Sequence, residues 1–204
     1  MKKSKEMIIL FVIISMVASL YWDNLLIKGI SLLRNGVLDS FFLGITFVSS
    51  EIIMFFVLTS FFLWKKEKRK WIIPLWSCLG ISALVSFILK IMIQRARPFQ
   101  LGIVELISAL ESTSYSIWNF SFPSFQSMLV FCSIPILSKQ FPKLKKFWIA
   151  FAILVAFSRV YFGVHFVSDV IAGGVIGYLI GVIVVREEKE NRFGEKIYNR
   201  IFKK

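Results

Sequence analysis

The sequence predicts an all-α integral membrane protein: a bundle of six transmembrane helices that forms a single domain over residues 1–204. Three observations support this fold class. The chain is 57% hydrophobic and contains 22 phenylalanines, which is too apolar for an ordinary soluble domain. Apolar runs long enough to cross a membrane recur along it. The segments between these runs are mostly short and basic, as expected for loops at a membrane surface.

Residues 7–22 form the first apolar run, which follows three lysines. The run ends in Tyr21 and Trp22, which are typical of a membrane interface, and no small-residue cleavage site follows. We therefore interpret it as a transmembrane helix rather than a signal peptide. Residues 23–39 mix apolar and polar side chains, which favours a short amphipathic helix at the interface, with a plain loop as the alternative.

Five further apolar runs complete the predicted bundle. They cover residues 42–64, 71–91, 123–137, 147–160 and 164–185. Glu51 interrupts the first of these five, and Pro123 opens the third, because proline is favoured in the first turn of a helix. The glycines of the last run suit close packing against another helix. The charged tail that begins at Arg186 is expected to lie on the membrane surface.

The basic residues predict the orientation of this bundle. With the N-terminus in the cytoplasm, 19 of the 25 lysines and arginines fall on the cytoplasmic side, which predicts that both termini are cytoplasmic. The net charge of +13 then reflects topology and contact with anionic lipid headgroups, so nucleic acid is not an expected partner. We expect a multi-pass protein of the cell membrane, with four helix ends meeting at its extracytoplasmic face.

Polar side chains gather at those four helix ends. Lys90, Arg97 and Arg159 are cations that could together neutralise a phosphoryl group. Ser124 offers a hydroxyl group, and Phe125 lies in the first turn of a helix, where free backbone N–H groups and the helix dipole favour an anion. The sequence therefore predicts a phosphate-binding site on the extracytoplasmic side.

His165 is the only histidine of the chain, and Asp169 follows it four residues later. On a helix the two side chains share a face, so the carboxylate can bond one ring nitrogen and leave the other free as a nucleophile toward phosphorus. A structural pair that caps a helix is the alternative. The two cysteines, Cys78 and Cys132, lie in apolar runs and predict neither a disulfide nor a metal site. With one histidine, no paired carboxylates at ligand spacing and no cysteine pair, we expect no metal and no cofactor.

Three short patterns follow one another: K-x6-R-P from Lys90, P-S at Pro123 and S-R-x5-H-x3-D from Ser158. Their order resembles the signature of the type 2 phosphatidic acid phosphatase superfamily, which includes membrane lipid phosphatases and polyprenyl-diphosphate phosphatases. The resemblance implies a metal-independent hydrolase in which His165 attacks phosphorus to form a phosphohistidine, with support from Asp169. It implies that the substrate phosphate is held by Lys90, Arg97, Ser124 and Arg159.

The second pattern departs from the family. The family reads P-S-G-H, and its histidine protonates the leaving oxygen, whereas this chain reads P-S-F-Q and ends in Gln126. Glutamine cannot deliver a proton, and general acid catalysis is worth roughly 10²–10⁴-fold in rate. A diphosphate should suffer less than a monoester, because its departing phosphate is a good leaving group. We therefore rank polyprenyl diphosphate first as the substrate, ahead of phosphatidic acid and phosphatidylglycerol phosphate.

Two other interpretations of Gln126 stay open. Glu105, Glu111 or Tyr115 could supply the proton instead. Alternatively, the chain could be a weakened or inactive homologue that binds lipid phosphates without turnover. A transporter is disfavoured, because no inverted repeat is evident and the polar residues gather at one face rather than at mid-membrane. Arg95 is interpreted as a surface charge or headgroup contact, and the formation of a homo-oligomer is left open.

Overall fold

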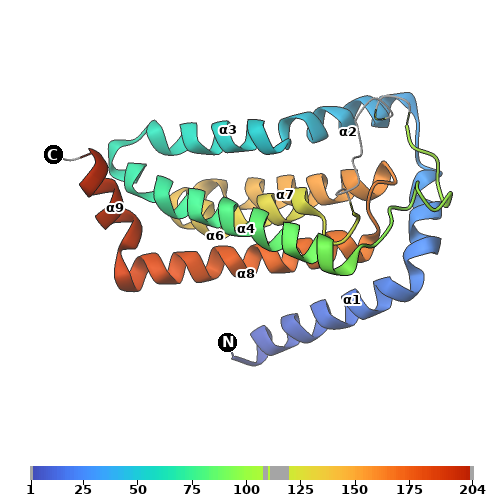
Figure 1. Ribbon diagram of the computed structural model, residues 1–204, viewed down its shortest axis with the longest axis horizontal. Coiled ribbons are helices and arrows are strands. Elements are labelled where there is room, and N and C mark those ends of the chain that lie inside the picture. The colour runs from blue at the N-terminus through green and yellow to red at the C-terminus, as the bar shows by residue number, and fades with distance from the viewer. Residues whose placement is uncertain (1, 108–109, 111–119, 203–204) are drawn as a thin grey trace.

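The computed structural model describes residues 2–107, 110 and 120–202, and within them it contains helices and no strands. The helices are α1 (Lys2–Ser31), α2 (Gly36–Val48), α3 (Glu51–Leu63), α4 (Ile72–Ile93), α6 (Phe125–Gln140), α7 (Lys145–Tyr161), α8 (Val167–Asn191) and α9 (Phe193–Phe202), with short 3-10 turns at Lys66–Trp71 and Pro142–Leu144. Helices α4, α6, α7 and α8 run along the long axis of the molecule, and α2 and α3 follow one another along one side (Figure 1). The all-α prediction is confirmed for this part of the chain.

Two helical segments are long and apolar enough to cross a membrane, residues Lys66–Ile93 and Val167–Asn191. A third span results if Val17–Ser31 and Gly36–Val48, which meet at a bend of 120°, are counted together. Helix α3 is apolar but only 13 residues long. These lengths identify a membrane protein, while the six separate spans stay a prediction.

Several of the predicted boundaries are wrong. The run expected to be one helix over 42–64 is divided, because α2 ends at Val48 and Ser50 adopts an extended conformation before α3 begins at Glu51. An acidic residue in the first turn favours such a start, since it lies at the positive end of the helix dipole. The expected interfacial helix over 23–39 is also absent as a separate element. Helix α1 continues to Ser31, and Asn35 starts α2 by accepting hydrogen bonds from two backbone N–H groups.

The last predicted span begins later than expected, at Val167 rather than at residue 164. The chain leaves α7 through Gly163, whose φ of +73° lies in the left-handed region that favours glycine. A Cβ atom at this glycine would also lie only 2.5 Å from a methyl carbon of Val104. His165 therefore lies in a turn before α8 and not inside a helix.

A stripe of glycines joins α8 to α6, as the sequence predicts. Gly173, Gly177 and Gly181 are spaced four apart on α8, and a Cβ atom on any of them would collide with a backbone oxygen of α6 or of the residue before it. At Gly173 that oxygen is the carbonyl of Ser124, at 2.5 Å. The stripe therefore sets how closely the first turn of α6 approaches the first turns of α8.

We expect Gly177→Ala to lower the free energy of unfolding by about 1–3 kcal/mol, because its new methyl group would overlap the backbone of Met128 and push the two helices apart. Gly80→Ala on α4 is the matched control, since nothing lies within 4 Å of the corresponding Cβ position. Thermal unfolding in detergent compares the two. Equal melting temperatures for the two variants would contradict the packing account.

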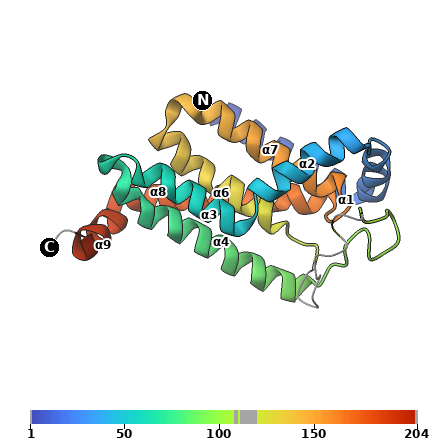
Figure 2. The same ribbon diagram turned by 90° about the horizontal axis from the view of Figure 1, so that it is seen from above.

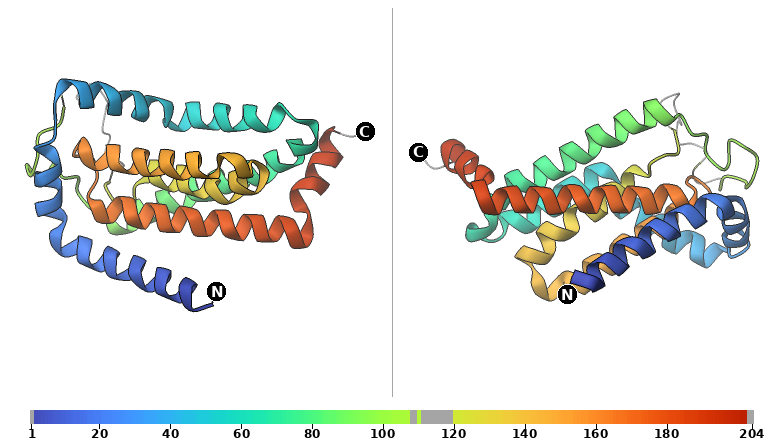
Figure 3. Two further views of the ribbon diagram at one scale, coloured as in Figure 1. Left: turned by 180° about the vertical axis from the view of Figure 1, so that it is seen from behind. Right: turned by 90° about the horizontal axis from the view of Figure 1, so that it is seen from below.

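The connections between helices divide between the two ends of the bundle (Figure 2). One end collects the α1–α2 junction, the turn between α7 and α8 and the described residues that follow α4 and precede α6. The other end carries α9 and the turn between α3 and α4. The view from behind and below shows the same division, with the N-terminal half of α1 standing apart from the bundle (Figure 3). The predicted site residues lie at the first of these ends.

Candidate active site

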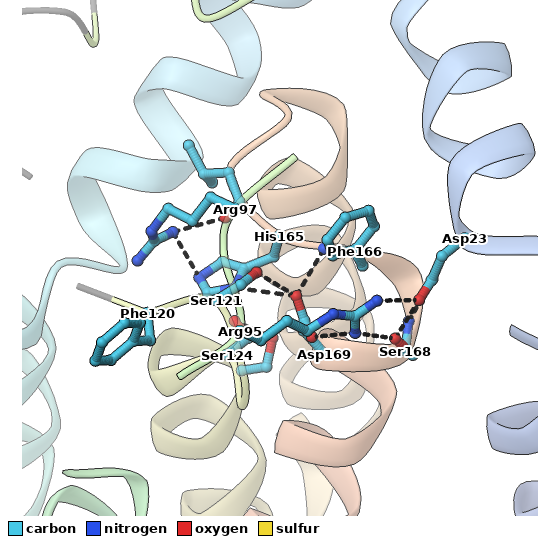
Figure 4. Close-up of polar contacts among 12 residues, drawn as sticks. Asp23, Arg95, Arg97, Phe120, Ser121, Ser124, His165, Phe166, Ser168 and Asp169 are labelled. Atoms are coloured by element: carbon cyan, nitrogen blue, oxygen red, sulfur yellow. Dashed lines mark hydrogen bonds and ion pairs between the residues drawn. The ribbon is translucent and has the colours of Figure 1, made fainter. Parts of the chain in front are cut away.

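Three segments that are distant in the sequence meet around His165 (Figure 4). They are the chain after α4, the residues that lead into α6, and the turn between α7 and α8. Ser121 donates its backbone N–H to the carbonyl of Arg95 at 2.7 Å, and Ser124 donates its own to the carbonyl of Asp169 at 3.1 Å. These two hydrogen bonds attach the segment before α6 to the other two.

His165 is 4% exposed and contacts charged groups through both ring nitrogens. Arg97 Nη1 lies 3.2 Å from His165 Nε2 and 2.6 Å from the carbonyl of Val164. A guanidinium can only donate, so Nε2 carries a lone pair, and the ring proton belongs on Nδ1. Nδ1 in turn faces Asp169 Oδ2 at 3.7 Å and the hydroxyl of Ser121 at 3.5 Å. This arrangement presents Nε2 as the nucleophilic nitrogen.

Burial lowers the pKa of His165 well below its ordinary value, because the charged ring would be removed from water. The positive charges of Arg97 and Lys90 lower this pKa further, and Asp169 opposes them. The imidazole is therefore neutral at neutral pH, which is the form that a nucleophile requires.

Asp169 is completely buried and lies in the first turn of α8. Its Oδ2 accepts the backbone N–H of Phe166 at 2.8 Å and the hydroxyl of Ser121. The carboxylate thus caps α8 and faces His165 at the same time. The sequence argument placed both residues on one helical face, and this is wrong, because His165 precedes the helix. The turn brings the two side chains together nonetheless.

Sequence reasoning missed a second carboxylate and its cation (Figure 4). Arg95, which was interpreted as a surface charge, donates through Nη1 to Asp169 Oδ1 at 2.7 Å and through Nη2 to Asp23 Oδ2 at 2.8 Å. Asp23, in α1, also accepts the backbone N–H of Ser168 at 3.0 Å and its hydroxyl. Arg95 precedes Arg97 by two residues, a spacing that could have indicated a shared site. No feature of the sequence around Asp23 indicates that it belongs to the site.

The predicted phosphate-binding side chains lie at three helix ends, those of α4, α6 and α7. Lys90 Nζ donates to the carbonyl of Phe120, and Arg159 Nη1 donates to Thr46 Oγ1 at 3.3 Å. Ser124 is fully buried, and its hydroxyl accepts from that of Ser127 at 3.1 Å instead of capping α6. Cations therefore approach the site from α4 and α7, and a serine from the start of α6.

The remaining predicted donor is the first turn of α6. Phe125 is the first residue of this helix, so its backbone N–H has no partner within the helix. It follows Ser124 directly, whose own backbone N–H donates to the carbonyl of Asp169. The turn therefore offers a backbone donor and a favourable helix dipole beside the cations.

Gln126 is the second residue of α6 and is half-buried. Its Nε2 donates to the carbonyl of Ser49 at 3.4 Å, and its Oε1 is buried without a hydrogen-bond partner among the described residues. Of the candidate substitute acids, Glu105 has an exposed side chain, and its carbonyl accepts a hydrogen bond from Arg34. Glu111 and Tyr115 lie outside the described residues.

Comparison with known proteins gives consistent matches. The family model of the PAP2 superfamily matches residues 71–193. Phosphatidylglycerophosphatase B of Bacillus subtilis is 38% identical over 129 residues, which cover 57% of this chain and 58% of the relative. Undecaprenyl-diphosphatase of Sulfolobus acidocaldarius is 30% identical over 116 residues, which cover 54% and 55%. The chain thus matches little more than half the length of either relative.

Two crystal structures share the fold. One is a transmembrane PAP2-type phosphatidylglycerolphosphate phosphatase from Bacillus subtilis, with a TM-score of 0.69, 28% identity and coverage of 91% of this chain and 96% of the other. The second is Aquifex aeolicus LpxE, with a TM-score of 0.62, 27% identity and coverage of 79% and 93%. The family match covers more than half of the chain and includes every residue of the three sequence patterns, so this protein belongs to the PAP2 superfamily.

Proposed function

We propose that this protein is a membrane lipid phosphatase that hydrolyses a lipid phosphate or diphosphate without a metal or other cofactor. One observation carries the proposal. The only histidine of the chain places its Nε2 3.2 Å from Arg97, a partner that can only donate, while its Nδ1 faces the buried carboxylate of Asp169. The two relatives of similar sequence are a phosphatidylglycerophosphatase and an undecaprenyl-diphosphatase, and their names support phosphate hydrolysis as the reaction here.

The reaction would proceed in two steps. Lys90, Arg97 and Arg159 neutralise the substrate phosphate, helped by the Ser124 hydroxyl and the Phe125 backbone N–H. His165 Nε2 attacks phosphorus, and the bond to the leaving oxygen breaks. The resulting phosphohistidine carries a positive ring that the carboxylate of Asp169 stabilises. Water then attacks the phosphohistidine, which releases phosphate and regenerates the neutral imidazole.

The site would face the extracytoplasmic side of the cell membrane in a single domain of six spans with cytoplasmic termini. The distribution of charge supports this orientation. The basic turn Lys66–Trp71 and the tail helix α9 lie at the end of the bundle opposite the turn between α7 and α8 (Figure 2). Cytoplasmic loops carry such an excess of lysine and arginine. A lipid substrate could then reach the site from the outer leaflet.

Gln126 determines which substrate we rank first. Its Oε1 has no hydrogen-bond partner among the described residues, and an amide cannot protonate the leaving oxygen, so the site favours a substrate whose leaving group needs little protonation. With metal chelated, we expect the purified protein to release phosphate from undecaprenyl diphosphate at least about tenfold faster than from phosphatidylglycerophosphate. Equal or faster release from the monoester would overturn the leaving-group argument.

The second candidate is a protein that binds lipid phosphate without turnover, and the same glutamine favours it. This alternative predicts that inorganic phosphate binds while neither substrate yields product. Phosphate release from either substrate that disappears in an Arg97→Ala variant would exclude it, because Arg97 contacts the ring nitrogen proposed to attack phosphorus.

A further inference from the structure

We propose that Asp23 and Arg95 are positioning residues for His165, acting as a carboxylate–guanidinium–carboxylate chain that ends on Asp169. Through Asp23, helix α1 would help to orient the nucleophile, even though α1 precedes all three sequence patterns. The catalytic consequence rests on the proposed function, whereas the effect on the imidazole ring does not.

The geometry of Arg95 supports this role (Figure 4). Its two terminal nitrogens bond two different carboxylates, at 2.7 Å to Asp169 and 2.8 Å to Asp23. The same Nη1 contacts the Ser168 hydroxyl at 2.7 Å, and the guanidinium lies 4.0 Å from the centre of the Phe166 ring. A planar group held on two edges and one face has one orientation, so it fixes the Oδ1 edge of Asp169.

The charges of Asp23, Arg95 and Asp169 act strongly on one another because the two carboxylates are buried. Asp23 is 3% exposed and Asp169 is 0% exposed, so neither carboxylate is solvated by bulk water. One guanidinium shared between two carboxylates leaves a net negative charge close to His165 Nδ1. Without Arg95, two buried carboxylates would lose their shared cation. Without the charge of Asp23, the guanidinium would act on Asp169 alone and weaken the electrostatic attraction of its carboxylate for the Nδ1 proton.

The position of the Asp169 carboxylate influences which nitrogen of the His165 ring carries the proton. Arg97 donates toward Nε2, which requires the ring proton on Nδ1. Asp169 Oδ2 faces Nδ1 across 3.7 Å and favours a proton there by its charge, and Arg95 and the backbone N–H of Phe166 hold the carboxylate in that position. A carboxylate that is free to turn would let the proton move to Nε2, which is then no longer a nucleophile.

A second buried clamp at the same end of the bundle provides the control. Tyr161 donates its hydroxyl to Asp39 at 2.6 Å and so ties α7 to α2. It resembles the contact of Asp23 with Ser168 in joining two helices, yet its partners are Asp39 and the backbone N–H of Asn35, neither of which contacts His165 or Asp169. Tyr161→Phe should therefore lower stability and leave the imidazole ring unchanged.

Because the chain has one histidine, the test can read that ring directly. We would label the full-length protein with ¹⁵N-histidine and record its ring nitrogens in detergent for wild type, Asp23→Asn, Arg95→Met and Tyr161→Phe. We expect Nδ1–H with unprotonated Nε2 in wild type and Tyr161→Phe. In Asp23→Asn and Arg95→Met we expect a mixture with protonated Nε2. Wild-type signals in both of these variants, or a wild-type ring protonated on Nε2, would overturn the proposal.

Turnover gives the second readout. We expect kcat to fall about tenfold in Asp23→Asn and about 100-fold in Arg95→Met, with KM within about twofold, because neither residue binds the substrate. Arg95→Lys keeps the charge but not the two-pronged geometry and should be intermediate. The double variant should be no slower than Arg95→Met, because both residues act through one chain. Wild-type kcat in folded Arg95→Met would overturn the proposal. Absence of turnover in wild type would refute the proposed function, and the ring spectra would still decide this inference.

Discussion

Gln126→His should raise the rate of phosphate release from a monoester such as phosphatidylglycerophosphate by about 10²-fold. The new imidazole would stand in the first turn of α6, next to Ser124 and Phe125, where the family pattern has its acid. It could protonate the leaving alkoxide, which Gln126 cannot do. With undecaprenyl diphosphate we expect less than about a tenfold gain, because the departing phosphate needs little protonation.

Gln126→Met is the matched control for this gain. Methionine has a similar length, lacks a titratable group and removes the hydrogen bond to the carbonyl of Ser49. A gain caused merely by loosening the contact between α6 and the α2–α3 junction would appear in both variants. A rise confined to histidine, and larger for the monoester, supports a site that is otherwise assembled. No rise with either substrate would mean that the acid position is not what limits turnover.

Much of the site could be predicted from the sequence because its residues lie at helix ends within short patterns. Lys90, Arg97, Arg159 and His165 each belong to a segment whose spacing limits where the side chains can lie. The structure places His165 in a turn after Gly163 and not in the predicted helix, but its side chain still lies beside Asp169. The order of the patterns along the chain was therefore more informative than the helical face argued for His165 and Asp169.

The positioning chain behind the nucleophile could not be predicted, for a physical reason. Asp23 and Ser168 are separated by 145 residues, and only the packing of α1 on α8 brings them together. No periodicity in either segment encodes that pairing. Arg95 was misjudged because charged residues near a membrane interface are usually solvated, and its partners are both distant in the sequence.

Among the helices, too, some features could be predicted from the sequence and others could not. The glycine stripe on α8 was predicted, because a spacing of four defines one face of a helix whatever its partner is. The break between α2 and α3 was not, since the apolar run continues through it and only Ser50 and Glu51 mark the new start. Hydrophobicity indicates where a chain can be buried, whereas polar residues at helix starts decide where it divides.

His165→Ala should abolish turnover, with phosphate release falling by at least about 10³-fold on every substrate. The expected loss is large because the variant removes the group that we propose to attack phosphorus and to carry the phosphoryl group afterwards. The cations Lys90, Arg97 and Arg159 remain in this variant. Inorganic phosphate should therefore still bind, which separates a missing nucleophile from a collapsed pocket.

The most direct test of the account is the rate of phosphate release by purified His165→Ala, measured beside wild type on undecaprenyl diphosphate with all divalent metal chelated. A wild type that turns over under chelation and a variant at the uncatalysed background are the predicted results. A folded His165→Ala protein that releases phosphate within about tenfold of the wild-type rate would show that another group attacks phosphorus, and the proposed mechanism would be wrong.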